Sequence, residues 1–345
     1  MSSLLAASDL VALFRTELER CALTSDESLV ILSEPNSRED YVAATFAAAQ
    51  SLGVRSVVST VLPGGSPVTA PGVRSGSGFG LAALEGFPSM LGFLKSVDMV
   101  VDVTIEGHIH AEMQQDILRA GTRILFVCDP PEILARNMTG PSDKARALAA
   151  VEMLGAANTM RVTSPYGTDL AMDISDSHPG FQTGFADDPG RWDHWPSCMV
   201  LCWPNRADGQ FVLATGDILF PFKEYVTQPI TIVVEDSRIV KVAGSGDQAF
   251  KVQQYCDEKN DDAAPFTSHM GWGLLPTADW LSLSMYDRES QIGMDGRSYE
   301  GDFLISTGPH PFMDRITPFH LDLPMRDCSI TLDSTLVLDQ GKVVA

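Results

Sequence analysis

A histidine and an aspartate near the C-terminus, His320 and Asp322, are separated by one residue. If the segment 319–323 is extended, side chains two positions apart point the same way, so the imidazole and the carboxylate project into one pocket. A further histidine would complete a 2-His-1-carboxylate set, which holds non-haem Fe(II) and leaves coordination positions open. The best candidate is His269, between a proline-containing loop and two glycines, because glycine lets backbone approach a bound ion closely. An H-x-D pair is also common by chance, so the metal site depends on the rest of the chain.

Two further histidines, His108 and His110, follow the apolar run 99–103. This run predicts a buried strand, and open α/β sheets bind ligands beyond the carboxyl ends of such strands. His110 also stands at the start of a predicted helix, whose positive end lowers the pKa of an imidazole and favours its neutral, basic form. Both histidines are candidates for a catalytic base, and the sequence leaves the choice between them open.

The first half of the chain alternates short apolar runs with helical patterns. Strands are predicted at 29–32, 54–58, 99–103 and 123–128, and helices at 4–21, 37–52, 81–94, 110–120, 131–137 and 143–154. This alternation predicts a doubly wound, largely parallel sheet in an α/β domain of residues 1–157. The segment 62–80, rich in Gly, Pro and Ser, lacks the dinucleotide and Walker fingerprints and predicts a surface loop or an active-site lid.

After residue 157 the chain consists of short strand patterns separated by turn residues. Strands are predicted at 158–163, 169–174, 197–203, 211–215, 230–235, 238–242, 303–306, 320–323, 329–332 and 335–338, with one clear helix at 248–259. We therefore expect residues 158–345 to form an α+β, strand-rich domain that carries the metal site and the catalytic residues.

Composition narrows the function classes. The 345 residues carry a net charge of −21, which argues against binding to nucleic acid or to an anionic membrane, because both need a basic surface. Met1–Phe14 lacks the basic start of a signal peptide, and no run approaches the ~20 apolar residues of a membrane span. The six cysteines are scattered and are expected to be reduced, and no G-x-S-x-G motif indicates a serine hydrolase. A soluble, cytoplasmic enzyme is expected.

Three motifs taken together resemble one known family. They are Gly107-His108-Ile109-His110, the run Arg161–Leu170 with its Thr-Ser-Pro-x-Gly-Thr-Asp core, and His269 with His320-x-Asp322. From about residue 25 to its end, the chain resembles the 2,5-dihydroxypyridine 5,6-dioxygenases of nicotinic acid degradation. This family shares its fold with the thermophilic-type metalloaminopeptidases, and the run Arg161–Leu170 belongs to that fold as a whole.

The resemblance implies a reaction and a set of site residues. It implies one Fe(II) held by His269, His320 and Asp322, with His110, or alternatively His108, as the base. The implied reaction is an extradiol-like cleavage of 2,5-dihydroxypyridine, or of a close hydroxylated aromatic, with O2 to give N-formylmaleamate. It further implies a homo-oligomer.

Two other functions stay open on the sequence. A thermophilic-type metalloaminopeptidase would bind two metal ions and need additional Glu and His ligands. The corresponding stretch 203–209 contains no Glu, and Gln291 stands where those relatives carry a ligating His, so one metal ion is expected rather than two. A relative that binds metal or ligand without catalysis is the third alternative.

Aromatic residues near these motifs are candidates for contact with the substrate ring. His194 lies in a loop rich in Asp, Pro and Gly, flanked by Trp192 and Trp195, while Trp272 and Phe319 neighbour the predicted ligands. We expect His194, Trp272 and Phe319 to line the substrate pocket, although each ring could equally belong to the hydrophobic core.

Overall fold

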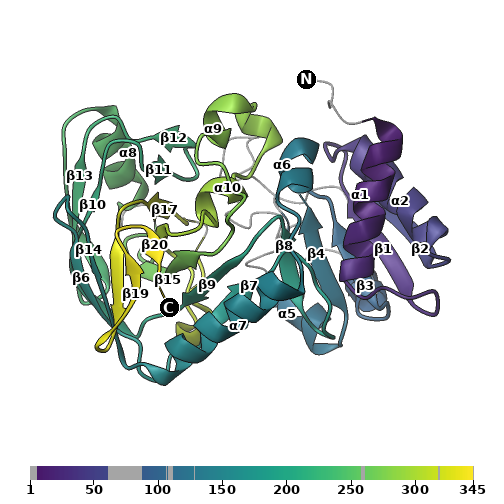
Figure 1. Cartoon of the computed structure of the whole chain (residues 1–345), viewed down its shortest axis with the longest axis horizontal. Coiled ribbons are helices and arrows are strands. Elements are labelled where there is room, and N and C mark those ends of the chain that lie inside the picture. The colour runs from purple at the N-terminus through teal and green to yellow at the C-terminus, as the bar shows by residue number, and fades with distance from the viewer. Residues whose placement is uncertain are drawn as a thin grey trace. The chain divides into compact units, whose positions relative to one another are not determined.

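In the computed structural model, the described residues are 6–60, 88–105, 107, 112–127, 129–257, 261–317 and 319–344 (Figure 1). The chain divides into two compact units. Unit 1 comprises Met1–Pro141, Gln182–Ser197 and Tyr286–Ile292, and unit 2 comprises Ser142–Phe181, Cys198–Met285 and Gly293–Ala345. The sequence placed a single boundary after residue 157, whereas the units first part after Pro141 and two later segments return to unit 1.

Unit 1 contains a five-stranded parallel sheet in the order β2-β1-β3-β4-β8 (Figure 1). Its elements are α1 (Ala7–Arg20), β1 (Ser28–Ser33), α2 (Glu39–Ser51), β2 (Arg55–Thr60), α4 (Pro88–Leu94), β3 (Met99–Asp102), α5 (Glu112–Arg119), β4 (Arg123–Val127), α6 (Pro131–Arg136), β8 (Trp192–Trp195) and the 3-10 helix η2 (Arg288–Ser290).

The helices of unit 1 cover both faces of this sheet. Successive side chains of a strand point to opposite faces, and alternate residues of β1 accordingly belong to two different hydrophobic clusters. Ile31 packs with residues of α1 and α2, whereas Val30 packs with residues of α4 and α5. Burial on both faces explains the continuous apolar runs. The predicted doubly wound, parallel sheet is confirmed.

Unit 2 contains an eight-stranded antiparallel sheet in the order β14-β13-β10-β6-β5-β18-β19-β20, a five-stranded sheet in the order β17-β16-β15-β9-β7, and the pair β11-β12. The strands are β5 (Thr159–Thr163), β6 (Asp169–Asp173), β7 (Gly180–Gln182), β9 (Met199–Cys202), β10 (Arg206–Leu213), β11 (Ile218–Leu219), β12 (Glu224–Tyr225), β13 (Ile230–Glu235), β14 (Arg238–Ala243), β15 (Thr267–Gly273), β16 (Phe303–Thr307), β17 (Asp322–Met325), β18 (Ser329–Leu332), β19 (Thr335–Asp339) and β20 (Lys342–Val343).

One long and several short helices complete unit 2, and one core holds its elements together. The helices are α7 (Pro141–Ala156), α8 (Asp247–Tyr255), α9 (Ser282–Met285), α10 (Met294–Arg297) and the 3-10 helix η3 (Pro311–Met313). The core takes Leu154 from α7, Phe211 from the larger sheet, and Trp272 and Leu323 from the smaller one. The expected strand-rich α+β part is confirmed.

Among the described residues, six strands, β7, β8, β11, β12, β15 and β20, come from segments that the sequence did not identify as strands, and two of them carry predicted site residues. β8 lies in the segment expected to be a polar loop, and β15 carries the glycines that were expected to admit an ion. A Cβ added to Gly271 would lie 1.9 Å from the carbonyl oxygen of Val200 on β9. This glycine therefore allows two strands to approach closely, and the expectation that it makes room for an ion is wrong.

This close approach predicts a stability effect. Gly271→Ala should lower the free energy of unfolding by about 3 kcal/mol, the upper part of the range for overpacked cores, because the clash is with backbone. Urea unfolding of the metal-free protein measures it. Gly92→Ala in α4 is the control, since nothing lies within 4 Å of an added Cβ there, and it should gain ~0.5–1 kcal/mol. Equal stability of the two variants would contradict the packing described.

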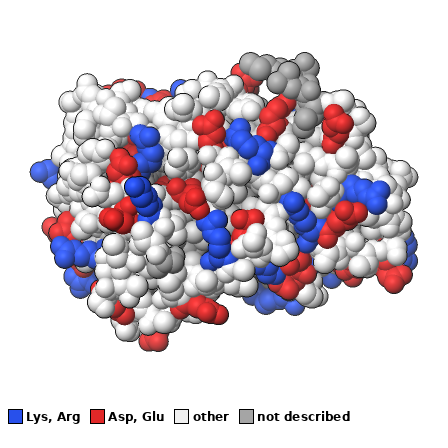
Figure 2. Space-filling view, viewed as in Figure 1, with Lys and Arg blue, Asp and Glu red and all other residues white. Residues whose placement is uncertain are grey.

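The charged side chains on the face drawn in Figure 2 are interspersed, with Asp and Glu beside Lys and Arg. Within the described ranges, no helix combines the length and apolar character that crossing a bilayer requires. The segment 62–80, expected to be a loop or lid, lies outside the described residues.

Candidate metal site

The five-stranded sheet of unit 2 brings the three predicted ligands together. His269 lies on β15, Asp322 begins β17, and His320 precedes that strand by two residues, with β16 between β15 and β17. Ser306 of β16 pairs with Asp322, so both side chains share one face. Its hydroxyl donates to the carbonyl of His269 at 2.7 Å. A small residue on the central strand thus leaves room for ligands from both neighbours to converge.

The three side chains present their donor atoms to one another. Nε2 of His269 lies 3.4 Å and Nε2 of His320 3.2 Å from Oδ1 of Asp322. The three donor atoms lie within 4.8 Å of one another and form the one such group of His, Cys, Asp or Glu found among the described residues. The side chains of His320 and Asp322 are 3% and 6% exposed, and that of His269 is 12% exposed.

The protonation of His320 shows that this cluster fits a metal ion. Its Nδ1 lies 2.7 Å from the carbonyl oxygen of Thr307, which can only accept, so Nδ1 carries a proton. In the neutral ring Nε2 is then a lone-pair acceptor, and it faces the carboxylate. Burial, the largest effect, lowers the pKa of His269 and so favours its neutral form too. Oδ1 of Asp322 is buried without a hydrogen-bond donor from the described residues. Nε2 of His320 and Oδ1 of Asp322 therefore face each other as two acceptors, and a cation bound between them would satisfy both.

The other carboxylate oxygen of Asp322 is held by Arg297 at the end of α10. Nε of Arg297 donates to Oδ2 at 2.7 Å, and its guanidinium lies 3.7 Å from the ring centroid of Phe220. Burial raises the pKa of the Asp322 carboxyl, but its contacts with His320 and Arg297 outweigh burial and hold that pKa well below its usual value. The carboxylate is therefore ionised and has Oδ1 turned to the histidines.

Comparison with known proteins identifies the family. The model of the 2,5-dihydroxypyridine 5,6-dioxygenase family matches residues 9–345. This chain belongs to that family. Its similarity to the 2,5-dihydroxypyridine 5,6-dioxygenase of Pseudomonas putida KT2440 is 38% identity over 340 residues, covering 97% of this chain and 96% of that protein. The solved structure of the 2,5-dihydroxypyridine dioxygenase from this strain superposes with a TM-score of 0.93 and 35% identity, covering 99% of this chain and 98% of that one.

This chain also has a more distant structural neighbour, the metalloaminopeptidase AmpT of Thermus thermophilus. The two structures superpose with a TM-score of 0.57 at 12% identity, over 98% of this chain and 99% of AmpT. At this low identity the superposition shows a common fold, and it gives no information about activity. The expected resemblance, to the dioxygenases in family and to the metalloaminopeptidases in fold, is confirmed.

The other predicted site residues of this family member have different outcomes. His108 and His110 lie outside the described residues. His194 lies on β8, where it is 1% exposed and packs edge-on against Phe126 with 4.9 Å between ring centroids. The expected surface loop at this position is wrong, because the segment forms a strand of the parallel sheet, and contact of His194 with substrate stays a prediction.

The two aromatic candidates beside the ligands, Trp272 and Phe319, differ in their surroundings. Trp272 is 1% exposed and belongs to the hydrophobic core with Met270. The strand directs this ring into the core, and the expected contact of Trp272 with substrate stays a prediction. Phe319 is partly exposed, adjoins His320, and packs edge-on against Tyr255 at 5.2 Å. Contact of Phe319 with substrate stays a prediction.

Three residues of the site escaped the sequence analysis. Arg297 and Thr307 orient Asp322 and His320, and Trp203 packs against His269 with 5.8 Å between ring centroids. No sequence motif links Arg297 or Thr307 to a ligand. Trp203 is the last residue of the predicted strand 197–203 and immediately follows the observed β9, and aromatic character at a strand end is the one signal that could have suggested it.

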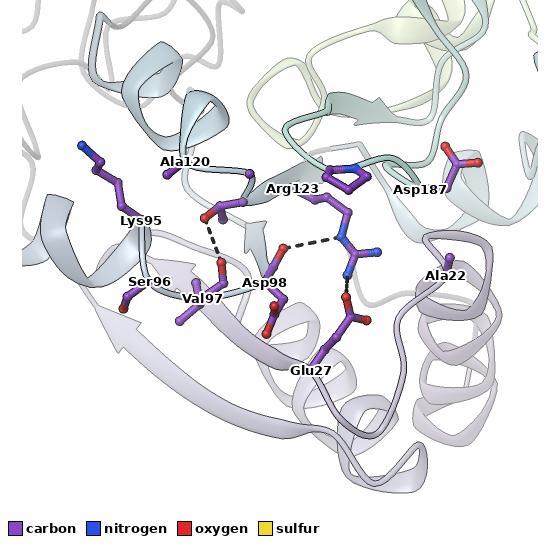
Figure 3. Close-up of a pocket in the computed structure, with 12 residues that line it drawn as sticks. Ala22, Glu27, Lys95, Ser96, Val97, Asp98, Ala120, Arg123 and Asp187 are labelled. Carbon is purple, nitrogen blue, oxygen red and sulfur yellow. Dashed lines mark hydrogen bonds and ion pairs between the residues drawn. The ribbon is translucent and has the colours of Figure 1, made fainter.

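Unit 1 has a cavity of about 420 Å³, shown in Figure 3, at the amino ends of β3 and β4. Arg123 in its wall donates to the carboxylate of Glu27 at 2.6 Å and to the backbone carbonyls of Cys21 and Asp98. These protein partners already occupy the guanidinium. Ligands of open α/β sheets bind at the opposite, carboxyl ends of the strands, so this cavity is not the candidate site.

Proposed function

We propose that this protein cleaves the ring of 2,5-dihydroxypyridine, or of a close hydroxylated aromatic, with O2 and one Fe(II) held by His269, His320 and Asp322. The buried cluster of two imidazoles and one carboxylate carries this proposal, and membership of the dioxygenase family supports it. A bound Fe(II) would supply a centre that takes both O2 and the ring hydroxyl and makes that hydroxyl easier to deprotonate.

The residues around the ligands prepare this site. The carbonyl of Thr307 fixes the tautomer of His320, which leaves Nε2 as a lone-pair donor for metal. Arg297 keeps Asp322 ionised and limits its rotation by holding Oδ2. Because all three ligands are largely buried, water is kept from the site and charges there interact strongly.

A neutral histidine would accept the proton of the ring hydroxyl, and we assign this role to His110, with His108 as the alternative. His110→Ala should lower kcat by about 10²- to 10⁴-fold, the usual contribution of a positioned base, with iron content unchanged. His108→Ala is the matched comparison. If only His108→Ala loses activity, the assignment of the base reverses.

The decisive experiment begins without oxygen. The protein is reconstituted with Fe(II), metal per chain is counted, 2,5-dihydroxypyridine is added and air is admitted. We expect one iron per chain, loss of the ultraviolet band of the ring with equal uptake of O2, and N-formylmaleamate as product. Two metals per chain, no O2 uptake and release of amino acids from peptides would instead indicate a metalloaminopeptidase.

Location and assembly are also proposals. We propose a cytoplasmic enzyme that assembles into a closed homo-oligomer, as its family resemblance implies. Light scattering of the purified protein measures its molar mass, and a value near the 37.3 kDa of one chain would contradict the oligomer.

A further inference from the structure

Beside His269 lies a row of aromatic rings that no predicted motif contained. The indole of Trp203 packs edge-on against the imidazole of His269, with 5.8 Å between ring centroids at 65°. Phe312, on η3, packs edge-on against the indole of Trp203, with 5.3 Å between ring centroids. His178 stacks on Phe312, with centroids 3.9 Å apart and planes only 9° from parallel. The row thus runs from a metal ligand outward to solvent.

The rings of Trp203 and Phe312 are held in place by the chain around them. A Cβ added to Gly180 of β7 would lie 3.2 Å from the indole of Trp203, so glycine makes room for that ring. The loop that carries Phe312 is closed by two backbone hydrogen bonds between His310 and Arg315, and Arg315 also donates to the carbonyl of Gly308 at 2.6 Å. The rings are therefore a preformed surface.

The protein partners and the exposure of the three ligands show which ligand is least enclosed. Arg297 occupies Oδ2 of Asp322, and the carbonyl of Thr307 occupies Nδ1 of His320. His269 is the most exposed of the three ligands, at 12%, and it is the ligand that Trp203 touches. Phe312 is 50% exposed, although a phenyl ring of that size is costly to leave in water.

The geometry points to Trp203 and Phe312 as the aromatic wall that receives the planar substrate ring beside His269. This inference rests on the proposed function for the identity of the ring. Offset or edge-on packing of a flat, electron-rich ring against an indole and a phenyl is favourable by itself, and it would set the distance and tilt of the ring at the metal. His178 stacks on Phe312 and supports it. Trp203 and Phe312 thus determine specificity for flat aromatic rings.

Anaerobic titration with 2,5-dihydroxypyridine tests the wall without turnover. Iron-loaded Phe312→Ala should bind the ring roughly 2- to 10-fold more weakly, and Trp203→Leu about tenfold or more, as expected for loss of aromatic packing. Trp203→Phe should restore most of the affinity. In air, KM should rise by the same factors while kcat and iron per chain stay near wild type. Phe250→Ala removes a 63% exposed phenyl from α8 and should leave Kd unchanged.

Two results would contradict the inference that Trp203 and Phe312 form this aromatic wall. One is an unchanged Kd in both Phe312→Ala and Trp203→Leu. The other is loss of iron from Trp203→Leu with normal Kd in the fraction that retains it, which would mean that Trp203 only supports His269. Failure of the proposed function is distinguishable: wild-type protein would then bind the ring without consuming O2, and the variants would still weaken that binding.

Discussion

Replacing His320 by alanine should abolish stoichiometric iron binding and ring cleavage together. His320 is 3% exposed and offers Nε2 to the cluster, while its Nδ1 is engaged by the carbonyl of Thr307. Loss of a partner behind a metal ligand typically costs ~10- to 100-fold in metal affinity or activity. Removal of the ligand itself leaves only His269 and Asp322, so we expect a loss greater than this ~100-fold.

Thermal unfolding with and without metal separates metal binding from folding. Fe(II) at about 100 times its Kd should stabilise the wild-type protein by about 2.7 kcal/mol, because it binds the folded state only. The His320→Ala variant should show no such gain at that concentration. His310→Ala is the matched control, since His310 is likewise buried, at 2% exposure, but lies outside the cluster. A metal-dependent gain in the His320→Ala variant equal to that of wild type would contradict the assigned ligand.

Replacing Arg297 by methionine should have the second large effect. Arg297 and Asp322 are each 6% exposed and form a buried ion pair at 2.7 Å. Removing one partner leaves an uncompensated buried charge, which typically costs ~3–5 kcal/mol. In the metal-free protein we therefore expect the free energy of unfolding to fall by about this amount. Added metal should restore part of it, because a divalent cation compensates the same carboxylate.

Arg297→Lys is the control that separates the effect of the positive charge from the effect of the guanidinium geometry. A lysine keeps the positive charge but lacks the planar guanidinium that donates to Oδ2 and lies over Phe220. We expect an intermediate loss of stability and a metal affinity roughly 10- to 100-fold below wild type, the usual effect of losing a partner behind a ligand. If Arg297→Met binds metal and unfolds like wild type, Asp322 does not depend on Arg297.

Local patterns in the sequence were sufficient for the parallel sheet and for the proximity of His320 and Asp322. The buried strands near Val30 and Val101 show as unbroken apolar runs, because helices cover both of their faces. His320 and Asp322 are close in space because they are two residues apart in extended chain, a property of the backbone alone. Both features depend only on neighbours along the chain, and both were predicted correctly.

Residues that act across strands could be recognised only in the folded chain. His269 was predicted as a ligand for the wrong local reason, since its glycine neighbours serve the pairing of β15 with β9. Arg297 and Trp203 contact the predicted ligands from segments distant in the sequence, so no sequence motif predicts these contacts.

The aromatic residues also show that proximity in the sequence does not predict contact in the folded chain. Trp272 is only three residues from a ligand, yet the strand directs it into the core, whereas Trp203 lies 66 positions from His269 and touches it. The direction of a side chain follows from strand register, and register is fixed by pairing with strands elsewhere in the chain. Chemistry-bearing residue types are therefore visible in the sequence, while their convergence on one site is a property of the tertiary structure.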